Sequence, residues 1–89
     1  MVNIKVTGNP GLTVDGDSYS ASVPVTAYDG NNTVIGQTSL IVIGLLSEGA
    51  ALAANFVTRL RAAAANWKAS VTVIEGLKVK LAKIVGMEL

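Results

Sequence analysis

The hydrophobic and polar positions of this 89-residue chain change their period at about Ser47. Before that residue, apolar side chains alternate with polar ones, most regularly over residues 18–28, where Tyr, Ala and Val alternate with Ser, Pro and Thr. A period of two is typical of a strand with one buried face. The pattern therefore predicts strands over residues 2–7, 18–28 and 33–43, with a brief extended stretch at residues 12–14.

Turn residues and breaks separate these predicted strands. The sequence Asp-Gly-Asn-Asn at residues 29–32 predicts a tight turn, so the two long strands that flank it should form a hairpin. Pro24 cannot donate a ladder hydrogen bond and predicts an edge strand or a bulge. The polar stretch at residues 36–39 predicts a second irregularity. The apolar run at residues 40–43 has no alternation, which predicts cover on both faces.

Residues 47–68 have the period of an amphipathic helix. Ser47 is a suitable N-cap, while Glu48 in the first turn and Lys68 in the last turn complement the helix dipole. An apolar stripe recurs every three or four residues and predicts the face that packs on the sheet. Its largest members are Leu52, Phe56, Leu60 and Trp67.

The opposite side of this helix carries small residues where a solvated helix usually carries Lys and Glu. Alanine is the best helix former, so the row has a purely conformational explanation. The alternative is that small side chains allow a second helix or sheet to approach closely. On that interpretation the row and a flanking arginine form an assembly interface, which comprises Ala51, Ala54, Thr58, Arg61, Ala62 and Ala65.

The residues after the helix predict a second hairpin over residues 70–85. Residues 70–74 are rich in β-branched side chains, and Glu75-Gly76 reads as a tight turn. Lys78 and Lys80 would then share one face of the last strand, where they either guard a strand edge or bind phosphate. Residues 86–89 form a tail.

These elements predict a single α+β domain over residues 1–89. An antiparallel sheet of four to five strands with two hairpins packs against one long amphipathic helix, in the order β-β-β-α-β-β. The segments are residues 2–43, 47–68, 70–85 and 86–89. The predicted core comprises Val23, Val25, Ile41, Leu52, Phe56, Leu60, Trp67, Val73 and Val79.

The chain offers little chemistry for catalysis. It contains neither His nor Cys, the side chains that most often act as general base, nucleophile or transition-metal ligand. Asp15 and Asp17 could face a cation, but Tyr19 occupies the next ligand position of a calcium loop. We therefore expect no enzyme activity, no catalytic residue, no metal and no cofactor.

Size and composition favour self-association. A domain of 89 residues buries a small fraction of its surface, and 51% hydrophobic against 15% charged residues is a high ratio for a lone small domain. In its low charge, lack of Cys and His and many Ser, Thr, Asn and Gly, the chain is similar in style to small bacteriophage virion proteins, such as capsid decoration, neck or tail subunits. This resemblance implies a structural homo-oligomer that is incorporated into a virion. Residues 1–5 lack the basic start and apolar run of a signal peptide, which predicts synthesis in the cytoplasm.

Two other functions are compatible with parts of the sequence. A nucleic-acid-binding module would use the basic C-terminal half, whose cationic residues are Arg59, Arg61, Lys68, Lys78, Lys80 and Lys83. A small membrane-associated protein would use residues 40–57, although Glu48 near the bilayer centre would cost about 3 kcal/mol. The net charge of +1 does not favour nucleic acid, and the polar residues within 40–57 make a membrane partner less favoured still.

Overall fold

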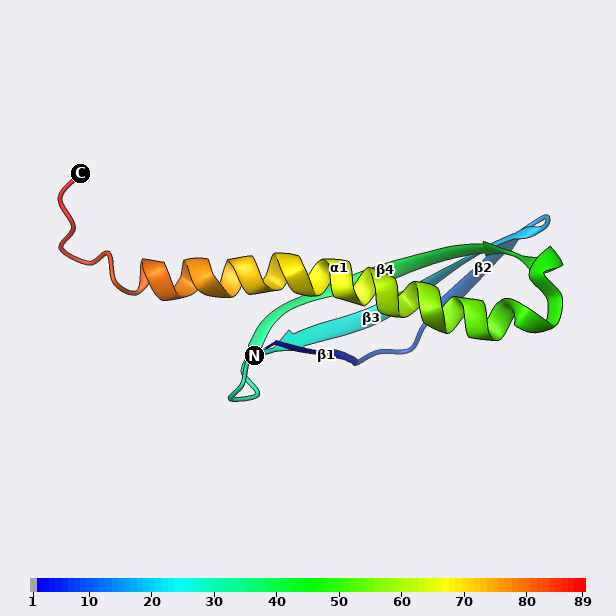
Figure 1. Ribbon diagram of the computed structural model, residues 1–89, viewed down its shortest axis with the longest axis horizontal. Coiled ribbons are helices and arrows are strands. Elements are labelled where there is room, and N and C mark those ends of the chain that lie inside the picture. The colour runs from blue at the N-terminus through cyan, green and yellow to red at the C-terminus, as the bar shows by residue number, and fades with distance from the viewer. Residues whose placement is uncertain (1) are drawn as a thin grey trace.

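The computed structural model describes residues 2–89, which form one antiparallel sheet and one long helix (Figure 1). The helix lies across one face of the sheet, so the predicted α+β architecture is confirmed. In chain order the elements are β1 (Asn3–Val6), β2 (Gly11–Asp15), β3 (Ser18–Tyr28), β4 (Val34–Leu45), the short 3₁₀ segment η1 (Leu46–Ala51) and α1 (Leu52–Leu81).

The sheet is built around β3, which is its central strand. On one side β4 pairs with the whole of β3, from Ser18 opposite Leu45 to Tyr28 opposite Val34. On the other side β2 pairs with the first half of β3 and β1 pairs with the second half. The strands β1 and β2 therefore form a single edge that is interrupted in the middle.

Pro24 explains that interruption. The carbonyl of Pro24 accepts a hydrogen bond from the Thr7 N–H at 3.0 Å, so the nitrogen of Pro24 also faces the β1–β2 edge. This nitrogen carries no hydrogen, and it faces the gap between the two short strands instead of a strand that needs a donor. The sequence-based prediction of an edge strand or bulge at Pro24 was wrong, because the neighbouring strand is interrupted instead.

The hairpin between β3 and β4 was predicted correctly. The Asp29 carboxylate accepts hydrogen bonds from the N–H groups of Asn31 (2.8 Å) and Thr33 (3.0 Å), which fixes the turn. The irregularity in β4 lies at Ile35, since Tyr28 pairs with Val34 and Ala27 pairs with Gly36. Residues 36–39 pair continuously with β3, so the break predicted there does not occur.

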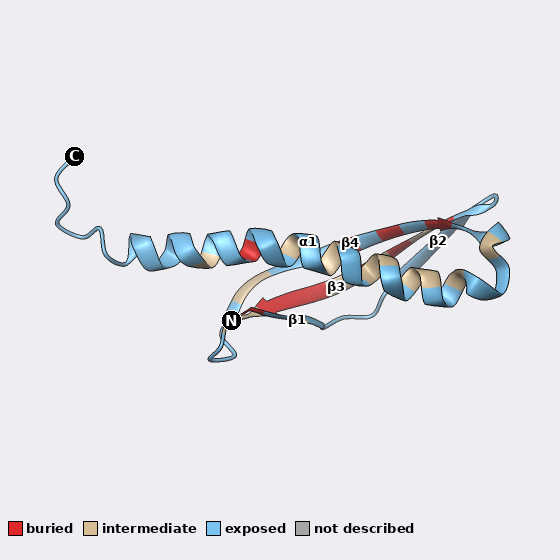
Figure 2. Cartoon of the chain, in the orientation of Figure 1, coloured by how far each residue is buried: buried red, intermediate tan, exposed pale blue. Residues whose placement is uncertain are grey.

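The core lies between α1 and the inner face of the sheet (Figure 2). Val23 and Val25 are buried as predicted, at 1% and 3% exposure. The four large side chains of the predicted helix stripe are half-buried and pack on three small groups of buried residues. These side chains are Leu52, Phe56, Leu60 and Trp67.

Three predicted core residues are exposed instead. Ile41 is 54% exposed because it lies opposite Ser22 on the outer face of the sheet, where no second layer covers it. Val73 and Val79 are 72% and 53% exposed because the part of α1 that carries them extends beyond the sheet. The expectation that residues 40–43 are covered on both faces was therefore wrong.

The predicted C-terminal hairpin over residues 70–85 is also wrong, because α1 continues to Leu81. Val71 lies one turn after Trp67 and is buried against Val2 and Ala27, so the helical period continues past the predicted end. The Thr72 hydroxyl donates to the Lys68 carbonyl at 2.8 Å, a bond available to Thr within a helix. Since β-branched residues cost a helix less than about 0.7 kcal/mol each, this packing prevails.

The continued helix makes the molecule long. Its principal extents are 59 × 27 × 18 Å, and its radius of gyration of 17.2 Å exceeds the roughly 12 Å expected of a compact domain of this length. At 1.5 Å per residue, α1 alone is about 45 Å long. Residues 72–81 of α1, termed here the projecting helix, extend past the end of the sheet (Figure 1).

The opposite orientation of neighbouring residues on β4 gives a test of the sheet register. Leu40→Ala should lower the free energy of unfolding by about 2–5 kcal/mol, because Leu40 is buried against Val23 and Val25. Ile41→Ala is the matched control and should cost less than about 1 kcal/mol, since its side chain is mostly in water. Urea denaturation measures both values, and equal losses would contradict the register.

A second substitution tests the helix over residues 72–81. Gly76→Ala should raise helicity and stabilise the chain by about 0.5–1 kcal/mol, because Gly76 is helical and no atom lies within 4 Å of an added Cβ. Circular dichroism and thermal unfolding measure these changes. A loss of helicity or stability in the Gly76→Ala protein would show that this glycine is needed for a turn.

Candidate assembly interface

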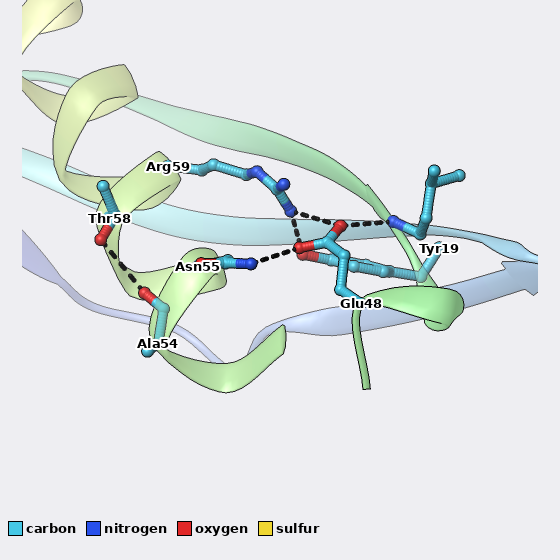
Figure 3. Close-up of polar contacts among 7 residues, drawn as sticks. Tyr19, Glu48, Ala54, Asn55, Thr58 and Arg59 are labelled. Carbon is cyan, nitrogen blue, oxygen red and sulfur yellow. Dashed lines mark hydrogen bonds and ion pairs between the residues drawn. The ribbon is translucent and has the colours of Figure 1, made fainter. Parts of the chain in front are cut away.

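The junction between β4 and α1 is held by one carboxylate. Glu48 of η1 accepts hydrogen bonds from the Leu45 N–H (2.8 Å), from the Asn55 side-chain amide (2.8 Å) and from Arg59 (2.9 Å) (Figure 3). It therefore joins the end of the sheet to the first two turns of the helix. Among residues 2–89 the Glu48–Arg59 contact is the only ion pair.

The arginine of this pair also rests on the sheet. The Arg59 guanidinium lies 3.5 Å from the Tyr19 hydroxyl, and the Tyr19 ring and Arg59 both lie over Gly44. A Cβ at position 44 would fall 2.5 Å from both groups, so only glycine fits here. Tyr19, Gly44 and Arg59 thus align β3, β4 and α1 at this end of the molecule.

The cluster changes the acidity of Glu48. Hydrogen bonding by Arg59, and then by the Leu45 N–H and the Asn55 amide, lowers the pKa of Glu48 from 4.5 to about 2. The same contact raises the pKa of Arg59. The pair connects the end of β4 with the first turns of α1, so its geometry fixes the angle between strand and helix (Figure 3).

The sequence indicated a different role for Glu48, namely a first-turn charge in a helix that begins at Ser47. The chain forms the 3₁₀ segment η1 there and kinks at Gly49, whose φ of 64° is readily adopted by glycine alone. The α-helix then begins at Leu52. No sequence signal links Glu48 to Tyr19 and Arg59, because the tyrosine precedes the arginine by 40 residues.

The predicted assembly interface is exposed along α1 and the end of η1. Every one of its residues is classed as exposed, and its only hydrogen bond here runs from the Thr58 hydroxyl to the Ala54 carbonyl at 3.1 Å (Figure 3). The row lies on the side of α1 away from the half-buried stripe. Its role in assembly stays a prediction. The residues are Ala51, Ala54, Thr58, Arg61, Ala62 and Ala65.

The projecting helix exposes a group of larger apolar residues that the sequence analysis assigned to a strand. Their exposure ranges from 45% to 72%. Ile74, Leu77 and Leu81 follow each other at intervals of three and four, so they lie along one side of the helix. This spacing was visible in the sequence and could have identified them. The group comprises Val73, Ile74, Leu77 and Leu81.

The outer face of the sheet exposes a second apolar group on β4. Ile41, Ile43 and Leu45 are 54%, 66% and 48% exposed, and each lies opposite a serine of β3. The strand that carries them is 12 residues long, contains no charged residue or proline, and forms an edge of the sheet. Charged residues and proline commonly protect an edge strand from pairing with another chain, and this edge has neither; its one irregularity lies at Ile35.

A polar cleft of about 360 Å³ lies beside Pro24, lined by Thr7, residues 24–26 of β3 and residues 37–39 of β4. Its most buried group, the Thr26 hydroxyl, is paired with the Thr7 hydroxyl at 2.7 Å and lies 3.4 Å from the Gln37 amide. No charged side chain lines the cleft. The arrangement satisfies a buried threonine and presents no reactive group.

The basic residues of the C-terminal half do not gather on one surface. Lys78 and Lys80 lie two positions apart on a helix and therefore point to different sides, whereas the predicted strand would have placed them together. Lys78 approaches the Ile35 carbonyl at 3.4 Å, and Arg59 is paired with Glu48. The geometry therefore gives no support to a concentrated phosphate-binding site.

Two further predictions from the sequence concern a metal site and a membrane segment. Within the described part of the chain, no group of three acidic, His or Cys side chains is placed to hold a metal ion. Residues 40–57 are divided among β4, η1 and the start of α1, and no described helix is long and apolar enough to cross a membrane.

Comparison with known proteins adds no relative, since no protein-family model, curated protein or solved structure matches this chain.

The Glu48 cluster predicts a specific pH dependence. A carboxylate whose folded pKa is lowered to about 2 contributes stability above pH 4.5 and loses it as the pH falls toward 2. Glu48→Gln should therefore melt at a lower temperature than the unaltered chain at neutral pH. The difference should shrink as the pH falls through this range.

Thermal unfolding at a series of pH values measures the effect of this substitution. Glu75→Gln serves as a control, because Glu75 lies on the projecting helix and makes no ion pair among the described residues. Its difference from the unaltered chain should vary less with pH. A Glu48→Gln difference that stays constant down to pH 2 would contradict the role given to the cluster.

Proposed function

We propose that this protein is a non-enzymatic structural subunit that works by homo-oligomeric assembly. One observation supports this most strongly: eighteen large hydrophobic residues are exposed in the described chain, while only nine hydrophobic residues are buried. Monomeric proteins rarely leave large apolar patches in water, and such patches mark association sites. Copies of the chain would cover that surface.

The total surface supports the same proposal. The accessible area is 6151 Å². A compact monomer of 9.1 kDa would expose about 4,900 Å², so the excess is roughly 1,250 Å². A typical stable interface buries about 800 Å² on each partner. The excess is therefore as large as the area that one or two contacts between subunits would remove.

The surfaces available for assembly lie on different sides of the molecule. The projecting helix offers an apolar side, the outer face of β4 offers an apolar row, and the small-residue interface on α1 allows close approach of another backbone. A subunit with several contact surfaces suits a particle or tube built from many copies. The compositional likeness to small bacteriophage virion proteins makes a capsid, neck or tail component the setting that we favour.

Light scattering after size exclusion, at two protein concentrations, tests the proposal. The expected result is a mass that is a multiple of 9.1 kDa and that rises with concentration. A monomer at millimolar concentration would overturn the proposal. Ala62→Glu should lower the mass if the small-residue interface contributes, while circular dichroism confirms that α1 remains folded.

A charge introduced on the projecting helix tests a separate surface. The double substitution Leu77→Lys and Leu81→Lys should reduce the assembled mass, because lysine on the apolar side would have to be desolvated. Val79→Lys is the matched control. Val79 is also an exposed apolar residue of the projecting helix, but it lies two positions from both leucines and faces another side. Equal losses of assembled mass in both variants would show that the side with Leu77 and Leu81 is not a specific contact surface between copies.

A further inference from the structure

An apolar groove of about 460 Å³ lies between β2 and the first turns of α1. It exists because α1 packs chiefly along β4 and leaves the inner face of β2 uncovered. Leu12 and Val14 pair with Ala21 and Tyr19 and therefore face the helix side of the sheet, yet they are 69% and 53% exposed. The opposite wall of the groove is formed by Leu46, Phe56 and Val57.

Segment 82–89, which follows α1, has the chemistry that such a groove would accept. Four of its side chains are large and apolar, and their exposure ranges from 38% to full. They make no part of the three core clusters in the described chain. These residues are Ile84, Val85, Met87 and Leu89.

The groove and this segment lie at opposite ends of the molecule. The groove is at the end where β2 meets the start of α1, and the C-terminus lies beyond the other end of the helix (Figure 1). The molecule is 59 Å long, so a chain cannot place its own segment 82–89 in its own groove without losing the projecting helix. A second copy can do so.

Charge favours this pairing of ends. Asp15 is the last residue of β2 and Asp17 lies in the turn that follows it. The Asp17 carbonyl accepts a hydrogen bond of 2.6 Å from the N–H of Leu46, which lines the groove. Lys80 lies in the last turn of α1 and Lys83 lies near the start of segment 82–89, which contains Glu88 as its single acidic residue. An acidic end would therefore meet a basic end.

We propose that segment 82–89 of one copy docks in the β2–α1 groove of the next copy, in a head-to-tail contact. The inference rests on the proposed assembly function and names the contact. A cavity of 150 Å³ holds a benzene ring, so the groove has room for roughly three groups of that size. Each copy then offers one groove and one segment, and the contact repeats into a ring or a filament.

Two variants test the contact between groove and segment. Each is first measured alone, and the two are then mixed. Leu12→Lys places a positive charge in the groove and repels the lysines of the incoming segment. The double substitution Val85→Asp and Met87→Asp places negative charges in the segment and repels the acidic turn. Each variant alone should bind its own copies more weakly than the unaltered chain does, by about tenfold or more.

The mixture tests whether the groove and the segment contact each other. The segment variant keeps an intact groove, and the Leu12→Lys variant keeps an intact segment, so one unaltered contact can form between them. An equimolar mixture should therefore recover an affinity that neither variant shows alone. A mixture that associates no better than the separate variants would overturn the inference.

Val6→Lys is the matched control, because Val6 is an exposed apolar residue on the same sheet edge but outside the groove. It should assemble as the unaltered chain does, and circular dichroism should show that all variants are folded. If the unaltered chain assembles and the groove and segment variants assemble equally well, the inference fails while the assembly function stands. If the unaltered chain is a monomer, both fail.

Discussion

A single helix forms the whole second layer of this fold, and it can cover only one face of one sheet. Every buried side chain of β3 and β4 that packs in the apolar core points toward α1, whereas the outward apolar side chains of β4 at positions 41, 43 and 45 remain exposed. The helix is narrower than the sheet and longer than it, so it leaves the inner face of β2 open at one end and projects beyond the strands at the other. The exposed apolar surfaces follow directly from this mismatch in dimensions.

The position of that helix depends on a few groups at the junction with β4. Glu48 binds the end of the strand and the first turns of α1 at once, and Arg59 reaches from the helix to Tyr19 above Gly44. A small core of valines and alanines does not by itself specify how a helix crosses a sheet. Directional hydrogen bonds to one carboxylate supply that specification, because they form at one helix angle only.

The strands, the β3–β4 turn and the stripe at Leu52, Phe56, Leu60 and Trp67 could be predicted from the sequence, because local periodicity and turn chemistry determine them. For residues 70–81 the sequence did not decide between a hairpin and a helix, because the residues around Val73 and Val79 fit both the period of two of a strand and the period of 3.6 of a helix. The helix is favoured because it buries Val71 against Val2, and these two residues lie far apart in the sequence. The small-residue row was found in the sequence, but the Glu48 cluster and the groove depend on the three-dimensional packing.

The interruption opposite Pro24 limits how this sheet can grow. The backbone groups of β4 form one continuous row, whereas the opposite edge is divided by residues 7–10 and offers no equally long partner. Any sheet extended through β4 therefore closes after two copies, with a broken strand at each outer boundary. A protein this rich in exposed valine and isoleucine thereby has a built-in barrier to cross-β polymerisation, in which each added strand must present a fresh template to the next.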